Sequence, residues 1–277
     1  MGSNLWKDAA MPEQPFVDIH CHLLPGIDDG SKSWDETLTM ARMAADDGIR
    51  TIIVTPHQLG AFAHNTGDII RERAAKVQRV LTENGIPLTI LPGGDVRIEP
   101  EMVHKLQTGE VMSLGDKRKH VLLELPHELY FPLGDVLSSL ERIGMDGILS
   151  HPERNQGILK DRSVLEPLVK SGCLMQVTAG SVMGTFGGNC QELAEWMLKR
   201  HLVHFIATDA HGPKSRRPLI LRAFQRIADM VGGDIATEIC CTNPARVAAG
   251  KTVKIMPVKT VPKRSAFSKL FSWSKSA

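Results

Sequence analysis

The chain has 277 residues, 42% of them hydrophobic, which is enough to bury the core of one α/β domain of the size typical of barrels. Its five cysteines are odd in number and show no C-x-x-C spacing, which argues against disulfides and a zinc-thiolate site and favours a reducing compartment. The net charge of +2 is unevenly distributed: residues 251–277 form a basic tail with seven Lys or Arg and no Asp or Glu, whereas residues 1–250 have a net charge of −5. The acidic body disfavours binding of extended nucleic acid.

The body alternates short apolar runs with helical patterns, as expected for a parallel sheet wound with helices. Ser33 stands three residues before Glu36 and predicts a capping box at the start of the first helix. The predicted strands are 16–22, 51–55, 88–91, 121–125, 147–150, 174–178 and 203–208. The predicted helices are 34–47, 66–84, 101–107, 133–143, 165–170 and 191–200. The pattern therefore predicts seven strand-plus-helix units.

The first strand carries the most informative motif. Because side chains alternate along a strand, His20 and His22 point the same way and Cys21 points to the other face. The following loop, with its prolines and glycines, is expected to bring Asp28 and Asp29 back past the strand end. Two imidazoles on one face make half a metal site, although such a pair taken alone is more often an ordinary core or surface pair.

Six of the seven predicted strands end in, or carry near the end, a His, Asp or Glu. For any one of these residues, a satisfied core histidine or a helix-capping acid is the simpler interpretation. In a parallel barrel, however, all strand carboxyl ends lie on one face, so the repetition predicts one constellation. Imidazoles and carboxylates without thiolates suit manganese, iron or zinc. The residues are His20, His22, His57, Asp95, Glu124, His151, Asp209 and His211.

Five ordered strings resemble the polymerase and histidinol phosphatase (PHP) superfamily: His20-x-His22, Thr55-Pro56-His57, Gly94-Asp95, His151-Pro152-Glu153-Arg154 and Asp209-x-His211. The loop PGIDDGS and the string HPER are most similar to its capsule-associated protein-tyrosine phosphatases. The resemblance covers residues 16–250 and implies a distorted (β/α)7 TIM-like barrel in a single domain. It leaves 1–15 as an N-terminal extension and 251–277 as a tail.

The resemblance also implies three divalent metal ions, usually manganese. The first ion would bind His20, His22, Asp95 and Asp209, and the second Asp95, Glu124 and His151. The third would bind Asp29, His57 and His211. The bridging position is normally Glu in this superfamily, whereas Asp95 is one methylene shorter, which leaves the spacing of the first two metals open.

Such a centre suits phosphomonoester hydrolysis. Three divalent ions, four carboxylates and one hydroxide leave a charge of about +1, which attracts a phosphate dianion. We expect Arg154 and Arg216 to bind phosphate oxygens, as the corresponding arginines do in the family, with Arg217 a rival for the second role. A phenol is a good leaving group, with a pKa of about 10, and no general acid is obvious in the sequence.

Three alternatives remain open. The first is the same fold with histidinol phosphate or a nucleotide, rather than phosphotyrosine, as the substrate. The second is a non-catalytic PHP docking module, although all nine metal positions hold competent residue types. Finally, Cys240 and Arg246 have the C-x5-R spacing of cysteine-dependent phosphatases, but the glycines of that motif are missing, so we expect a buried strand end there.

The family resemblance implies a partner, the tyrosine-rich tail of a membrane-bound bacterial kinase of capsule or exopolysaccharide synthesis. No signal peptide and no apolar run of 18 residues occurs, so we expect a cytoplasmic protein. In the segment 263–275, Phe267, Leu270 and Phe271 would share one face of a helix with a basic rim. This predicts peripheral contact with the inner face of the membrane, and a disordered tail is the alternative.

Overall fold

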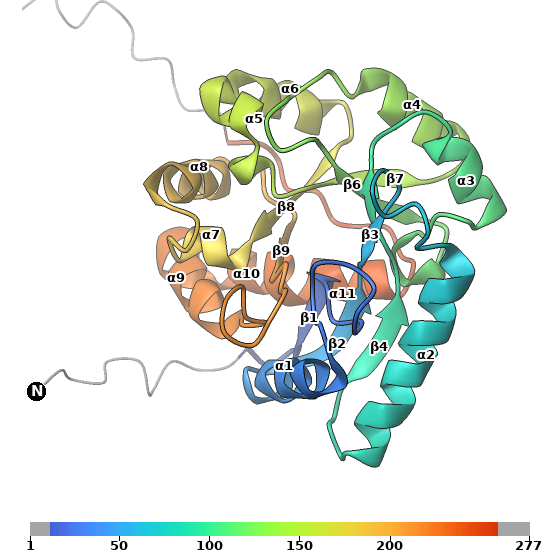
Figure 1. The fold of residues 1–277 in the computed structure, drawn as a ribbon. Coiled ribbons are helices and arrows are strands. Elements are labelled where there is room, and N and C mark those ends of the chain that lie inside the picture. The colour runs from blue at the N-terminus through green and yellow to red at the C-terminus, as the bar shows by residue number, and fades with distance from the viewer. Residues whose placement is uncertain (1–11, 260–277) are drawn as a thin grey trace, which may run out of the picture.

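The computed structural model describes residues 12–259, which form one mixed α/β domain with two parallel sheets (Figure 1). The first sheet has the order β1-β2-β4 and consists of β1 (Phe16–Cys21), β2 (Ile49–Val54) and β4 (Thr89–Pro92). The second has the order β3-β5-β6-β7-β8-β9. Its strands are β3 (His57–Gln58), β5 (Asp95–Arg97), β6 (His120–Glu124), β7 (Asp146–Ser150), β8 (Leu174–Thr178) and β9 (Phe205–Ala207).

Helices surround the strands (Figure 1). They are α1 (Trp34–Asp46), α2 (Gly67–Glu83), α3 (Met102–Thr108), α4 (Gly134–Arg142), α5 (Gln156–Lys160), α6 (Leu165–Lys170), α7 (Ala179–Val182), α8 (Gly188–Lys199), α9 (Leu221–Val231), α10 (Gly233–Thr237) and α11 (Asn243–Ala248). The predicted N-cap of α1 is confirmed, since the Glu36 backbone N–H donates to Ser33 Oγ. The Glu36 carboxylate accepts from the Lys32 backbone N–H rather than from that of Ser33.

Side chains from both sheets share one inner core. Ile19 and Ile53 from the first sheet and Leu122, Ile148 and Phe205 from the second belong to a single cluster and are fully buried. A larger cluster fills the space between the strands and the surrounding helices. Burial of a large aliphatic side chain contributes about 1.5–3 kcal/mol, so this inner cluster strongly stabilises the packing of the two sheets against each other.

Strand β1 joins the second sheet at the chain segment that follows β9. The backbone N–H of Asp209 donates to the carbonyl oxygen of His20 (2.8 Å), and that of His22 donates to the carbonyl oxygen of Ala210 (2.9 Å). The fully buried Asp18 accepts hydrogen bonds from the backbone N–H (3.0 Å) and the hydroxyl (2.5 Å) of Thr208. Burial raises the pKa of Asp18 to about 6 in spite of these bonds.

The strand pairing differs from the predicted seven-stranded barrel. The structure has two sheets instead of one closed barrel, and two additional short strands, β3 and β5, begin at His57 and Asp95. The chain passes between sheets at Pro56 and again at Gly93-Gly94, where a proline without an N–H and two glycines interrupt the ladder. His57 and Asp95 are then direct partners in the second sheet.

Two expectations about the end of the chain have different outcomes. The predicted strand end at Cys240 is wrong, because Glu238–Thr242 is a π-helical turn that runs into α11, with both cysteines buried. The amphipathic segment 263–275 lies outside the described residues. Among residues 12–259, no helix combines the length and apolar character needed to cross a membrane.

Candidate metal centre

The imidazoles of His20 and His22, at the carboxyl end of β1, point toward the same place. Nδ1 of His20 lies 2.8 Å from Oε1 of Gln176, and Nδ1 of His22 lies 2.8 Å from Oδ2 of Asp28. Because these oxygens can only accept, each Nδ1 donates to its partner, so Nε2 is the nitrogen that each imidazole offers to a cation once it is deprotonated. The two Nε2 atoms lie 3.2 Å apart, so both histidines are oriented as metal ligands.

Two buried carboxylates face these imidazoles. Oδ2 of Asp95 lies 3.5 Å from Nε2 of His20, and Oδ1 of Asp209 lies 3.2 Å from the same nitrogen. Both carboxylates are buried, yet neither oxygen of Asp95 and not Oδ1 of Asp209 has a hydrogen-bond partner. Buried carboxylate oxygens that accept no hydrogen bond are unfavourable, and a divalent cation would satisfy them. The donor set therefore fits a metal.

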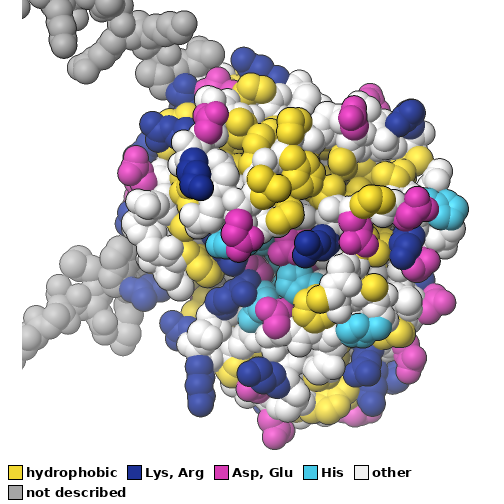
Figure 2. Space-filling model, turned by 45° about the horizontal axis from the view of Figure 1, so that its top comes forward, with side chains coloured by type: hydrophobic (Ala, Val, Ile, Leu, Met, Phe, Trp, Pro, Cys, Tyr) yellow, Lys and Arg dark blue, Asp and Glu magenta, His cyan; other side chains and the backbone are white. Residues whose placement is uncertain are grey.

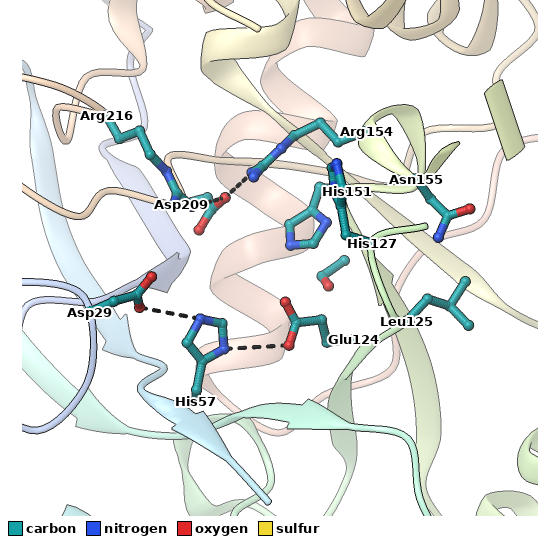
Figure 3. Close-up of a pocket in the computed structure, with 11 residues that line it drawn as sticks. Asp29, His57, Glu124, Leu125, His127, His151, Arg154, Asn155, Asp209 and Arg216 are labelled. Atoms are coloured by element: carbon teal, nitrogen blue, oxygen red, sulfur yellow. Dashed lines mark hydrogen bonds and ion pairs between the residues drawn. The ribbon is translucent and has the colours of Figure 1, made fainter. Parts of the chain in front are cut away.

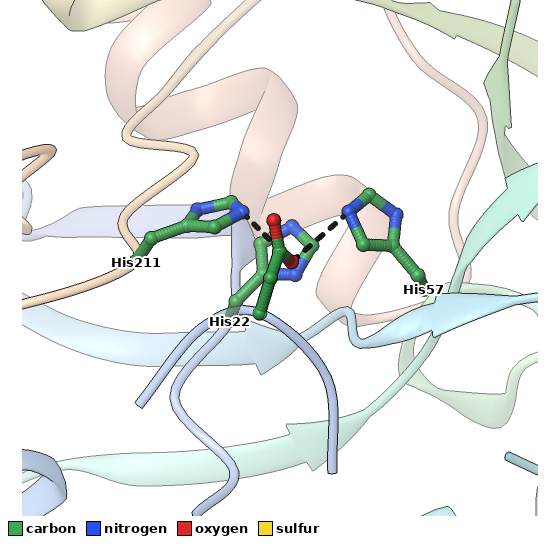
Figure 4. Close-up of side chains that lie close together, drawn as sticks. His22, His57 and His211 are labelled. Carbon is green, nitrogen blue, oxygen red and sulfur yellow. Dashed lines mark ion pairs between the residues drawn. The ribbon is translucent and has the colours of Figure 1, made fainter. Parts of the chain in front are cut away.

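The outer part of the centre is built around His57 and Asp29. Nε2 of His57 and Nε2 of His211 each lie 3.4 Å from Oδ1 of Asp29, whereas Nδ1 of His57 faces Asp95 (3.3 Å) and Glu124 (3.4 Å). The rings of His22, His57 and His211 converge (Figure 4). Asp29, the most exposed of this set, places the outer edge of the centre within reach of solvent.

All nine residues predicted as ligands lie in four overlapping groups, and within each group the ligand atoms are within 4.8 Å of one another. The groups are His22, Asp29, His57 and His211; His20, His22 and Asp95; His20, His151 and Asp209; and His57, Asp95 and Glu124. The grouping differs from the assignment that the resemblance implies at several points: His22 also lies with Asp29, His57 and His211, and Asp209 is not grouped with His22 and Asp95. His57, and not His151, accompanies Asp95 and Glu124, and His151 lies with His20 and Asp209.

Burial and neighbouring charges shift the pKa values of the site histidines in opposite directions. Burial alone would lower the pKa of His20, but the carboxylates of Asp209 and Asp95 raise it to about 9. His57, against three carboxylates, likewise has its pKa raised far above the ordinary value in spite of burial. For His151 burial dominates and lowers the pKa to about 3. In the protein without metal, the protonated imidazoles of His20 and His57 balance the negative charge of the neighbouring carboxylates.

A cavity of about 210 Å³ lies over the centre, lined by both predicted phosphate-binding arginines (Figure 3). The guanidinium groups of Arg154 and Arg216 reach Oδ2 of Asp209 from two different loops, the latter at 2.5 Å. The ring of Phe186 lies 4.3 Å from the Arg154 guanidinium carbon and supports it by a cation–π contact. In the space-filling view, histidines occupy a hollow bordered by basic and acidic side chains (Figure 2).

Three site residues have left-handed backbone although none is glycine. The φ angles are 32° for His151, 49° for Asp209 and 48° for Arg216. Each lies in a segment that follows a strand, where the chain must turn sharply to aim its side chain at the cavity. Such a conformation is disfavoured for residues with a Cβ and is typical of functional sites.

Several residues of the site were missed by sequence reasoning. Gln176 lies within β8 and gave no signal, because a glutamine in an apolar strand resembles any buried polar residue. Glu153 is fully buried, and its Oε1 accepts from the Thr178 backbone N–H (2.9 Å) and the Ser181 hydroxyl (2.7 Å), which ties the Arg154 segment to α7. Asp28 was expected only to return near the strand end, and the structure places it behind His22.

A family model for capsular polysaccharide synthesis, CpsB/CapC, matches residues 16–249. The chain belongs to the CpsB/CapC family. Tyrosine-protein phosphatase YwqE of Bacillus subtilis (strain 168) is 33% identical to it over 91% of this chain and 99% of the relative. Tyrosine-protein phosphatase CpsB of Streptococcus pneumoniae is 27% identical over 84% and 98%. The sequence-based resemblance to capsule-associated phosphatases is thus confirmed.

Solved structures agree with the CpsB/CapC assignment. A crystal structure from a study of YwqE from Bacillus subtilis and CpsB from Streptococcus pneumoniae, described as metal-dependent tyrosine phosphatases, matches with a TM-score of 0.84 and 32% identity. It covers 89% of this chain and all of that chain. The phosphotriesterase homology protein from Escherichia coli matches with a TM-score of 0.56 at 12% identity, which shows a shared fold alone.

The hydrogen bond from His20 to Gln176 generates a first prediction. Gln176→Leu keeps the side-chain volume but removes the acceptor that fixes the His20 tautomer, so metal affinity should fall by about 10- to 100-fold. Gln176→Glu keeps an acceptor and should retain the metal. Calorimetric titration of the metal-stripped protein with Mn²⁺ measures the metal affinity of both variants. Equal affinity of Gln176→Leu and the wild type would show that Gln176 does not orient His20.

The raised pKa of His20 generates a second prediction. A pKa of about 9 means that His20 carries a second ring proton, on Nε2, at pH 7 in the metal-free protein, and this proton must leave before Nε2 binds a cation. Metal binding should therefore release protons, and the apparent affinity should rise from about pH 6 to about pH 9. Calorimetry in buffers of different ionisation enthalpy measures the release. A binding enthalpy independent of the buffer would contradict it.

Proposed function

We propose that the chain is a metal-dependent phosphomonoester hydrolase that acts on phosphotyrosine in proteins. One observation carries the proposal: two guanidinium groups and a nine-residue His, Asp and Glu centre open into the same cavity. The family and the tyrosine phosphatases similar to this chain support phosphotyrosine as the substrate. A phosphate dianion fits the arginines, and the centre fits the cations that phosphate hydrolysis uses.

The nine residues hold three divalent cations in this proposal, with manganese as the first choice and iron or zinc as alternatives. When bound, these cations polarise the phosphoryl group and lower the pKa of a nucleophilic water. Gln176 and Asp28 keep His20 and His22 in the tautomer that leaves Nε2 free for a cation. The two sheets are joined where β1 meets the segment after β9, and in this proposal they act as one distorted barrel that presents its strand ends to the substrate.

Arg154 and Arg216 bind the phosphate. Their guanidinium groups already meet at Asp209, so both are held at the edge of the cation centre before substrate arrives. Each can donate two parallel N–H groups to phosphate oxygens, which stabilises the charge that moves onto these oxygens in the transition state. Phe186 beneath Arg154 and the buried Glu153 beside it restrict the movement of the Arg154 segment.

The leaving group is the phenolate of tyrosine. Its conjugate acid has a pKa of about 10, so it departs with less help from a general acid than an alkoxide needs. The natural substrate we propose is the phosphotyrosine tail of a membrane-bound bacterial tyrosine kinase of capsule synthesis. The match to a capsular polysaccharide synthesis family supports this partner.

The test of the proposal combines metal content with a substrate panel. Purified protein should contain two or three first-row divalent ions per chain by elemental analysis, should hydrolyse a phosphotyrosine peptide, and should lose this activity in chelator. His22→Ala should abolish activity while the circular dichroism spectrum is retained, because only a ligand is removed. Full activity after metal removal, or hydrolysis of histidinol phosphate or nucleotides in preference to the peptide, would overturn it.

The arginine contacts generate a separate prediction. Arg154→Ala should lower kcat/KM by about two to four powers of ten, because a charge-assisted contact to the transferring group is lost in a partly buried site. Metal content should not change. Arg217→Ala is the matched control, since this neighbouring arginine is exposed and does not line the cavity. Steady-state kinetics that leave Arg154→Ala equal to Arg217→Ala would assign Arg154 a structural role.

A further inference from the structure

The loop between β6 and α4, residues 125–133, forms one wall of the cavity and is here termed the rim loop. Its sequence, LPHELYFPL, is apolar apart from His127 and Glu128 and contains no Lys or Arg. Leu125 and His127 line the cavity itself. Leu129 is 57% exposed. Hydrophobic side chains gather on this face beside the hollow with the histidines (Figure 2).

The rim loop is fastened to the segment that carries the phosphate-binding Arg154. Nδ2 of Asn155 donates to the carbonyl oxygens of Pro126 (2.8 Å) and Leu129 (3.0 Å). The backbone N–H of the next residue, Gln156, donates to the carbonyl oxygen of His127 (2.9 Å). The distance between the apolar rim and the phosphate-binding group is therefore fixed before a substrate arrives, which reduces the entropy lost on binding.

Close packing leaves the rim loop little room to move away. A Cβ atom built on Gly157, in α5, would lie 2.5 Å from the backbone nitrogen of Tyr130, so the backbone of the rim loop packs directly against α5. The ring of Phe186 packs against the Arg154 guanidinium and adds a second apolar surface beside it. A phosphate held by Arg154 thus has apolar side chains nearby, from the rim loop and from Phe186.

We propose that the rim loop docks an apolar side chain adjacent to the phosphotyrosine of a peptide substrate, with Leu129 as the principal contact. The inference rests on the proposed phosphotyrosine phosphatase function and adds a sequence preference to it. Continuity of the rim with the phosphate cavity fixes where such a peptide lies. A nucleotide or other polyanion is disfavoured there, because the rim offers no cation and places Glu128 beside Leu129.

The experiment compares two phosphotyrosine peptides, one with leucine and one with glycine on both sides of the phosphotyrosine, with p-nitrophenyl phosphate as the reference substrate. The full metal-loaded chain should prefer the leucine peptide about tenfold in kcat/KM, mainly through KM. Leu129→Ser should remove most of this preference, and Leu129→Met should retain it.

Ile255→Ser is the matched control. Ile255 is 54% exposed but follows Lys254, whose backbone N–H bonds to Asn243, which in turn contacts His204 at the amino end of β9, away from the cavity. This variant should keep the full preference for leucine. Equal rates with both peptides in the wild type, or an unchanged preference in Leu129→Ser, would overturn the docking role alone. Hydrolysis of histidinol phosphate but of neither peptide would overturn the proposed function together with it.

Discussion

The metal centre depends on the junction between β1 and the segment that follows β9. Strand β1 brings His20 and His22, and the segment after β9 brings Asp209 and His211, from positions almost 190 residues apart along the chain. Two backbone hydrogen bonds and the buried Asp18 set the relative height of these segments. A shift of one residue along β1 would turn both imidazoles away from the centre, because strand side chains alternate. By bonding to Thr208, the interior carboxylate of Asp18 thus helps to align the candidate ligands of the two segments.

The centre concentrates unlike charges at the carboxyl ends of the strands, and each charge has a defined counterpart. Asp28 and Gln176 lie behind the two imidazoles of β1, one charged and one neutral, so the tautomers are fixed without adding a second carboxylate. Asp209 lies between the histidines and the two arginines. The His and Asp cluster and the two arginines are therefore adjacent parts of one electrostatic arrangement, as the proposed phosphoryl transfer requires.

The residues that the sequence predicts as ligands do lie together, because they end or follow strands whose carboxyl ends meet and carry side chains of the right chemistry. The sequence does not predict Gln176 or Phe186, whose roles arise from contacts across the fold and leave no local pattern. The short strands β3 and β5 escape the periodicity because two or three residues show none. The prediction of a strand end at Cys240 is wrong because a short buried run suits a strand and a helical turn equally well. His57 lies beside Asp95 and Glu124 because β3 and β5 pair in register at His57 and Asp95, which residue types do not encode.

The left-handed backbone at His151, Asp209 and Arg216 has an evolutionary consequence. Each conformation disfavours the residue that occupies it by of order 1 kcal/mol, and glycine would relieve it. Selection for stability alone would therefore drift toward glycine at the positions that the proposed chemistry needs most. A homologous sequence that keeps the fold but has glycine there would mark a lineage released from catalysis, and such sequences identify domains retained as scaffolds.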